Sequence, residues 1–219
     1  MMKGNKMCGI CASSDLNKFK ELVRQNASRG NFSHSFTVFD FKEKIIKQQI
    51  KSFIQTELES DLNKLMINEN YYYISHTQAP TGSLVQDFEK IHPSIQTNGI
   101  YSSYLWHNGI LTDKFMEEHY HGGLWDTNIL HQYTRLDKIS GIEGSFACIY
   151  LDDFKDLFCF RNPQAPLYML NDTISSIQFE KSMMIESGVY YQLIKQNDNL
   201  YFDKIDNKRF ICFNIYEID

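Results

Sequence analysis

The stretch Met7-Cys8-Gly9-Ile10 stands near the start of the chain and decides how the rest of the sequence is interpreted. If the mature protein begins at Cys8, through initiation at Met7 or removal of residues 1–7, this residue carries both a thiol and a free α-amino group. An α-amino group titrates at about pH 8 and can therefore accept the thiol proton at neutral pH. This arrangement predicts a nucleophile at Cys8. The alternative is a buried cysteine in a first strand, because free cysteine is among the most buried residue types.

The composition indicates one globular domain. The 219 residues are 42% apolar and 14% aromatic, which is enough for one sizeable core. We therefore predict a single domain over residues 8–219, preceded by an N-terminal extension or propeptide over residues 1–7. The formal net charge of -5 is spread along the chain, which argues against nucleic acid or an anionic membrane as a direct partner. No apolar run approaches the ~18 residues of a membrane-spanning helix, and no signal peptide precedes Cys8.

The cysteines favour a reducing compartment. Five cysteines are an odd number in a chain without a secretion signal, so we expect a cytoplasmic protein without a disulfide framework. Cys8 and Cys11 have the spacing of half a zinc site or of a redox pair. A structural zinc site needs a second pair, which is missing, and a redox pair belongs between a strand and a helix start. The other three, Cys148, Cys159 and Cys212, alternate with apolar residues and are predicted to lie in the core.

Hydrophobic periodicity predicts many strands and few helices. Strands are expected at 8–13, 35–41, 71–78, 93–97, 100–106, 145–152, 156–161, 166–170, 174–179, 188–194, 199–204 and 208–216. Helices are expected between a cap at Ser14 or Asp15 and Gly30, and at 55–66, 112–120 and 126–138. Residues 43–53 fit either a helix or the second arm of a hairpin. This pattern indicates an α+β fold, with two mainly antiparallel sheets and the helices outside.

Several short stretches follow one another in a specific order. They are Met7-Cys8-Gly9-Ile10, Ser28-Arg29-Gly30, Ser75-His76-Thr77-Gln78-Ala79-Pro80-Thr81, His92-Pro93, Leu105-Trp106-His107-Asn108-Gly109-Ile110 and Trp125-Asp126-Thr127. In this order they resemble the glutaminase domain of class II glutamine amidotransferases, which are N-terminal nucleophile hydrolases. Weaker matches follow at Phe160-Arg161-Asn162-Pro163 with Pro166-Leu167-Tyr168, and then at Phe179-Glu180.

The resemblance implies a fold and a reaction. The fold is a four-layer αββα sandwich with Cys8 at the end of a central strand. In the reaction, Cys8 attacks the side-chain carbonyl of glutamine, ammonia leaves, and water releases glutamate from the thioester. The side-chain amide of Asn108 and the backbone N–H of Gly109 match the oxyanion hole. No cofactor and no metal are implied.

The resemblance also assigns substrate-binding residues. Asp126 matches the residue that binds the substrate α-ammonium group, and Thr81 matches a hydroxyl donor to the α-carboxylate. Arg29 and Gly30 match a loop that shapes the pocket around the nucleophile. His76 lies inside the carboxylate-binding stretch and is counted among these candidates.

The histidines of the chain are expected to have mainly structural roles. His76, His92 and His107 lie inside the matched stretches, where we expect structural hydrogen bonding. His119, His121 and His131 are close enough in sequence to suggest a metal site. No carboxylate or cysteine completes a ligand set at suitable spacing, so we expect surface histidines on helices instead.

The sequence departs from the family at two places. The family's stretch normally reads His-Thr-Arg, with the arginine binding the glutamine α-carboxylate, whereas this chain has Gln78. An amide cannot supply the charged bidentate pair of a guanidinium, and hydrogen bonds to charged groups are worth about 1.5–3 kcal/mol. Weaker glutamine binding, another compensating cation or a different substrate would each follow from this change. The second departure is residues 1–7, which would acylate the base if they were retained.

Three functions are open at this point. The first is a glutaminase that supplies ammonia to a separate aminating enzyme, which would be its partner protein. The second is a stand-alone hydrolase of another γ-glutamyl amide. The third is a catalytically silent glutamine-sensing or assembly subunit, which is favoured if residues 1–7 persist.

Overall fold

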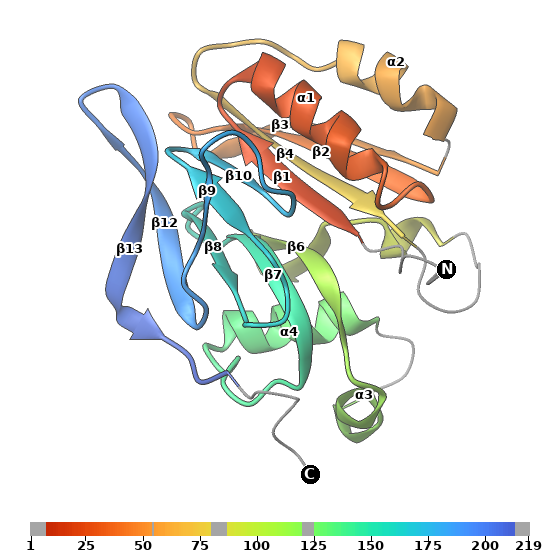
Figure 1. Cartoon of the computed structure of the whole chain (residues 1–219), viewed down its shortest axis with the longest axis vertical. Coiled ribbons are helices and arrows are strands. Elements are labelled where there is room, and N and C mark those ends of the chain that lie inside the picture. Colours follow the sequence, from red (N-terminus) through yellow and green to blue (C-terminus); the bar gives the residue numbers. More distant parts are fainter. Residues whose placement is uncertain (1–7, 54, 80–86, 120–124, 213–219) are drawn as a thin grey trace.

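The computed structural model describes residues 8–53, 55–79, 87–119 and 125–212. Two antiparallel sheets form its centre (Figure 1). In spatial order, the first sheet as described contains β11 (Met183–Met184), β9 (Tyr168–Leu170), β10 (Thr173–Ser175), β1 (Gly9–Ser13), β4 (Tyr71–Gln78), β2 (Ser33–Asp40) and β3 (Ile45–Ser52). The second contains β13 (Asn199–Arg209), β12 (Val189–Gln196), β8 (Leu157–Arg161), β7 (Gly144–Leu151), β6 (Tyr101–Leu111) and β5 (Ser94–Asn98).

Helices cover the outer face of each sheet. The α-helices are α1 (Leu16–Ala27), α2 (Leu58–Asn63), α3 (Asp113–His119) and α4 (Asp126–Arg135), with short 3-10 turns η1 (Gln55–Glu57) and η2 (Phe88–Lys90). Helices α1 and α2 lie over the first sheet, and α4 lies on the far side of the second (Figure 1). The layers therefore run helix, sheet, sheet, helix, which confirms the predicted αββα sandwich.

The core follows from the two-residue alternation of the strands. In β1, Ile10 and Ala12 point between the sheets, where they meet Trp106 and Ile149 of the second sheet. Cys11 points the other way, into a separate cluster under α1 and α2. Each sheet thus buries both of its faces, and the site at the end of β1 is built on a strand that is enclosed on both sides.

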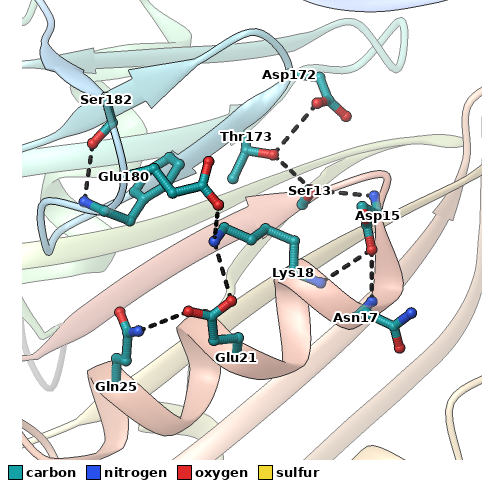
Figure 2. A network of polar contacts seen from close by, with 11 residues as sticks. Ser13, Asp15, Asn17, Lys18, Glu21, Gln25, Asp172, Thr173, Glu180 and Ser182 are labelled. Carbon is teal, nitrogen blue, oxygen red and sulfur yellow. Dashed lines mark hydrogen bonds and ion pairs between the residues drawn. The ribbon is translucent and has the colours of Figure 1, made fainter.

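The far end of β1 fixes the start of α1 (Figure 2). Asp15 is the N-cap, and its carboxylate accepts the backbone N–H groups of Asn17 and Lys18 at 2.8 and 3.0 Å. The Ser13 hydroxyl is paired with that of Thr173 on β10 at 2.8 Å. These bonds turn the chain sharply from strand to helix, as the predicted cap required.

Several predicted elements are corrected by the structure. The structure also decides between the two alternatives for residues 43–53: residues 45–52 form a strand, because they pair along β2 and complete a hairpin. The predicted strand at 174–179 ends at Ser175. The predicted break after residue 204 is absent, because β13 runs without interruption from Asn199 to Arg209; residues 213–216 of the second predicted strand lie outside the described residues. Cys148 and Cys159 lie in the core as predicted, but Cys212 follows the last strand and is only half-buried.

Candidate active site

Cys8 immediately precedes β1, the strand that lies between β10 and β4 in the first sheet. Because both neighbours run antiparallel to β1, the residues that follow β10 and β4 lie beside the nucleophile. The half-buried Cys8 side chain places Sγ 3.6 Å from the carbonyl oxygen of Ala79, just after β4. The candidate nucleophile thus sits where three strand ends meet.

The environment of the thiol disfavours its ionisation. Burial raises the pKa of Cys8 to about 11, with the Asp126 carboxylate adding to the increase and the Arg29 guanidinium opposing it. Two candidate residues from distant parts of the sequence therefore act on the thiol electrostatically. A thiol with this pKa needs a local base before it can attack a carbonyl at neutral pH.

Arg29 and Gly30 lie in the turn that ends α1. The Arg29 guanidinium donates from Nη1 to the carbonyl oxygen of Ser176 at 2.8 Å, while Nη2 is buried without a partner among the described residues. Gly30 packs on the backbone that follows β4, where an added Cβ would lie 2.6 Å from the carbonyl oxygen of Thr77. Only glycine permits this approach, which holds the Arg29 turn against the strand that ends beside Cys8.

Asn108 and Gly109 lie on β6, in the second sheet. Asn108 is 2% exposed, and its Nδ2 donates to the Ser176 hydroxyl at 3.0 Å. Gly109 has φ +152, and an added Cβ would lie 1.8 Å from the carbonyl oxygen of Ser145 on β7. Asn108 is therefore joined through Ser176 to the first sheet and to the residues around Cys8.

Asp126 is the first residue of α4, and its side chain is 22% exposed. One carboxylate oxygen, Oδ1, accepts the Thr127 backbone N–H at 2.7 Å. The other, Oδ2, lies 3.9 Å from Nδ1 of His107. This partly exposed carboxylate next to the nucleophile offers a place for a substrate cation.

A buried histidine cluster lies behind Asn108 and Asp126. Nε2 of His76 is 2.9 Å from the carbonyl oxygen of His107, which can only accept, so His76 carries its proton on Nε2. Nε2 of His107 likewise faces the Ser145 carbonyl at 3.3 Å, which leaves Nδ1 as an acceptor 3.1 Å from the Thr127 hydroxyl. The single proton of that hydroxyl is shared between His107 Nδ1 and Oδ1 of Asp126, which lies at 3.3 Å. That hydroxyl in turn accepts from Nε2 of His92 at 3.1 Å. One neutral tautomer of each ring satisfies all these bonds.

The cluster stays uncharged at physiological pH. Burial lowers the pKa of His76 to about 3 and also lowers the pKa values of His92 and His107. The rings of His76 and His92 stack with their centroids 3.5 Å apart, an arrangement that two imidazolium ions would oppose. The neutral cluster therefore places no positive charge of its own beside the Asp126 side chain. The placement of His76 favours the expected structural role over direct contact with a substrate.

The histidine cluster makes stability depend on pH. Its folded-state pKa values lie below the unfolded value of about 6.5, so the unfolded chain takes up protons first as the pH falls. Stability is complete above about pH 6.5 and is expected to fall by up to about 1.4 kcal/mol per pH unit for each buried histidine. Urea unfolding at pH 7.5, 6.5 and 5.5 measures this slope. His76→Gln, which keeps a donor but cannot titrate, should reduce the slope by one histidine's share; an unchanged slope would contradict the assignment.

Gln78 is already engaged by the protein. Its Oε1 accepts the Ser33 hydroxyl at 2.7 Å, so the amide nitrogen is the group left to donate to a ligand. Thr81, the other residue expected to contact the α-carboxylate, lies outside the described residues. The structure therefore brings together Cys8, Arg29, Asn108 and Asp126, with Gln78 on the strand that ends beside them.

Sequence reasoning missed Ser176 and Asn26. Ser176 follows β10 and contacts both Asn108 and Arg29, while Asn26 donates its amide to the neighbouring Ser175 at 3.0 Å. Both are buried. Serine and asparagine near strand and helix ends carry no motif, so only the pairing of β1 with β10 reveals their position.

The late family-like stretch has a structural role. The Arg161 guanidinium donates to the carbonyl oxygens of Ile185 and Asn162, at 2.7 and 2.9 Å. Asn162 accepts the Phe146 N–H at 3.0 Å and donates to the Gly144 carbonyl at 2.7 Å. These bonds fix the start of β7 beside Gly109.

The histidines outside the cluster are not all at the surface. His131 is fully buried on α4, with Nδ1 and Nε2 each 3.0 Å from a hydroxyl, of Ser94 and Ser103 respectively. This corrects the predicted surface position, because α4 turns this side of the helix toward β5 and β6. His119 stacks on Phe115, and His121 lies outside the described residues. The part of the chain that the structure describes contains no group of three or more residues suited to bind a metal ion.

The comparisons with known proteins establish the class of fold. No protein-family model matches the sequence, and no curated protein matches it. Among solved structures, the chain shares its fold with one named as an amidotransferase and with one described as an enzyme of purine biosynthesis. Among the described residues, no helix combines the length and apolar character that crossing a membrane requires.

Two of these structures illustrate the likeness. One is glutamine phosphoribosylpyrophosphate amidotransferase from B. subtilis, complexed with ADP and GMP, with a TM-score of 0.58 and 15% identity over 92% of this chain. The other, described as the allosteric regulatory enzyme of purine biosynthesis, has a TM-score of 0.59 and 15% identity over 90% of this chain. The match spans 50% and 49% of those chains, about half their length.

Proposed function

We propose that this chain is a glutaminase of the class II glutamine amidotransferase type. The observation that carries the proposal is the convergence of Cys8, Asn108 and Asp126 at the end of the central strand of an αββα sandwich. A nucleophile, an oxyanion donor and an acceptor for an ammonium group are the parts that hydrolysis of an amino-acid amide requires.

Each group has a defined step in the proposed reaction. The α-amine of a chain that begins at Cys8 takes the thiol proton, and Sγ attacks the side-chain carbonyl carbon of glutamine. The Asn108 amide and the Gly109 N–H stabilise the negative oxygen of the tetrahedral intermediate. The C–N bond then breaks and the proton passes to ammonia. Water attacks the thioester, which releases glutamate and restores the thiol.

The proposed product, ammonia, would pass to a separate aminating enzyme. The structures that share this fold are about twice as long as the matched region, and one of them is named as an amidotransferase. Ammonia released by a glutaminase is useful to an enzyme that aminates an acceptor molecule, and a cytoplasmic location fits such a pairing. That enzyme is a partner that binding experiments would have to identify.

A covalent label tests the proposed site directly. Protein that begins at Cys8 is incubated with a diazoketone analogue of glutamine, which alkylates a thiol with loss of nitrogen gas. We expect one equivalent of label on Cys8 by peptide mass mapping, and protection by excess glutamine. Label on Cys212 instead, the other half-buried cysteine, would contradict the proposal.

The Gln78 position tests which substrate the site prefers. Gln78→Arg is expected to lower the KM for glutamine about 10- to 100-fold, because a guanidinium adds charged hydrogen bonds to the α-carboxylate. Steady-state glutamate release measures the change. Gln78→Met has a similar length without donors and should raise KM. If Gln78→Arg also raises KM, the carboxylate does not bind at this position, and γ-glutamyl amides with other leaving groups become the substrates to assay.

A further inference from the structure

Ser176 occupies a junction between the two sheets. It directly follows β10, is 1% exposed, and lies beside Ile10 at the start of β1. Its hydroxyl accepts the backbone N–H of Ile10 at 3.0 Å and the Nδ2 group of Asn108 at 3.0 Å. It donates its proton to the carbonyl oxygen of Ile10 at 3.3 Å. One donor and two acceptors are all that a hydroxyl offers, so Ser176 is fully used.

These bonds determine how the Asn108 amide is directed. A primary amide has two N–H groups, and the bond to Ser176 holds one of them. Because the amide is planar, fixing one N–H also fixes the direction of the second, which is the N–H that the proposed reaction assigns to the oxyanion. The backbone carbonyl oxygen of Ser176 also accepts a hydrogen bond from the Arg29 guanidinium at 2.8 Å.

The Ile10 bonds tie this arrangement to the nucleophile. The Ser176 N–H also donates to the Ile10 carbonyl, at 2.9 Å, so residue 10 is bound through both its backbone groups. Cys8 is two residues away on the same backbone. A shift of β1 relative to β6 would therefore have to break bonds to Ser176.

We propose that Ser176 is a positioning residue that aligns the Asn108 amide with Cys8 across the two sheets. This inference rests on the proposed glutaminase function. Ser176 does not contact the substrate; it acts by restricting Asn108 and the start of β1. Misplacement of a catalytic group by about 1 Å is enough to lower a rate by about 100-fold.

Ser176→Ala and Ser13→Ala form a matched pair. Both variants remove a buried hydroxyl that joins β1 to the segment containing β10, but Ser13 lies at the far end of β1, paired with Thr173 (Figure 2). For Ser176→Ala we expect kcat for glutamine hydrolysis to fall about 10- to 100-fold, with KM changed by less than about threefold. Ser13→Ala should keep kcat within about threefold. Equal losses in the two variants would overturn the proposal.

A double-mutant cycle with Asn108 separates positioning from simple stability. Asn108→Ala alone should lower kcat about 100- to 1000-fold. If Ser176 acts through Asn108, adding Ser176→Ala to that variant should change kcat by less than about threefold. A full 10- to 100-fold further loss would show that Ser176 acts independently of Asn108 and would overturn the inference.

A spectroscopic measurement keeps the two proposals distinct. The side-chain amide of Asn108 should give two well-separated ¹H–¹⁵N signals in the wild type and in Ser13→Ala, because one N–H is held by Ser176. In Ser176→Ala the difference in ¹H chemical shift between the two signals should become smaller. If the wild type hydrolyses no glutamine, the proposed function fails while these signals still test Ser176; signals unaltered by Ser176→Ala would overturn the positioning role.

Discussion

Protein that begins at Cys8 is expected to hydrolyse glutamine, and protein that keeps residues 1–7 is expected to be at least about 10⁴-fold less active. In the longer form the nitrogen of Cys8 is part of a peptide bond and cannot accept a proton. The Cys8 thiol has a pKa of about 11, so without a local base about one molecule in 10⁴ carries a thiolate at pH 7. Intact mass and N-terminal sequencing identify the two forms, and ammonia release measures their activity.

Two cysteine variants control this experiment. Cys8→Ala should abolish ammonia release from the processed form. Cys11→Ala should retain it, because Cys11 points into the cluster beneath α1 and has no place in the reaction. Native protein that keeps residues 1–7 and still releases ammonia at the rate of the processed form would rule out the α-amine as the base. Native protein that keeps them and is inactive would instead favour the glutamine-sensing subunit.

Gly109→Ala is expected to have the largest effect on the fold itself. An added Cβ at this position would lie 1.8 Å from the Ser145 carbonyl oxygen and 2.8 Å from Nε2 of His107. Strands β6 and β7 would have to separate, which breaks the His107–Ser145 bond and displaces Asn108. We expect the free energy of unfolding to fall by at least about 3 kcal/mol, together with loss of glutamine hydrolysis. Urea unfolding and ammonia release measure the two effects.

Gly99 provides the matched control. It also has a positive φ, +63, but an added Cβ there meets no atom within 4 Å. Gly99→Ala therefore introduces only backbone strain, expected to be about 1–2 kcal/mol, with full activity. If Gly109→Ala were no more destabilising than Gly99→Ala, the inference that β6 and β7 are too close to admit a side chain at position 109 would be wrong.

The layered arrangement of sheets and helices could be predicted from the sequence, because strands and helices differ in the spacing of their apolar residues. Alternating apolar residues identified most of the strands, and Asp15 was one of two residues named as the cap of α1. The segment from residue 43 to 53 could not be assigned, because Ile46 and Ile50 are spaced as on a helix. This segment is a strand because it pairs with β2, and the spacing of residues within a segment does not reveal which strand it will pair with.

The sequence identified candidate site residues only where a short, continuous motif surrounds them. Cys8, Asn108 and Asp126 stand in recognisable stretches, and the structure brings them together. Ser176 and the buried position of His131 follow from which elements pack against each other, and no local pattern encodes that. The stacking of His76 on His92 is likewise a product of tertiary structure.

The bonds between Ile10 and Ser176 join residues that are 166 positions apart. During synthesis, the Ile10 N–H therefore lacks this partner until residue 176 has been made. The nucleophile and its oxyanion donor come into register only when this late segment docks. Catalytic competence would then appear only after this segment has docked, so a newly made chain carries an unaligned Cys8 until β10 and Ser176 are in place.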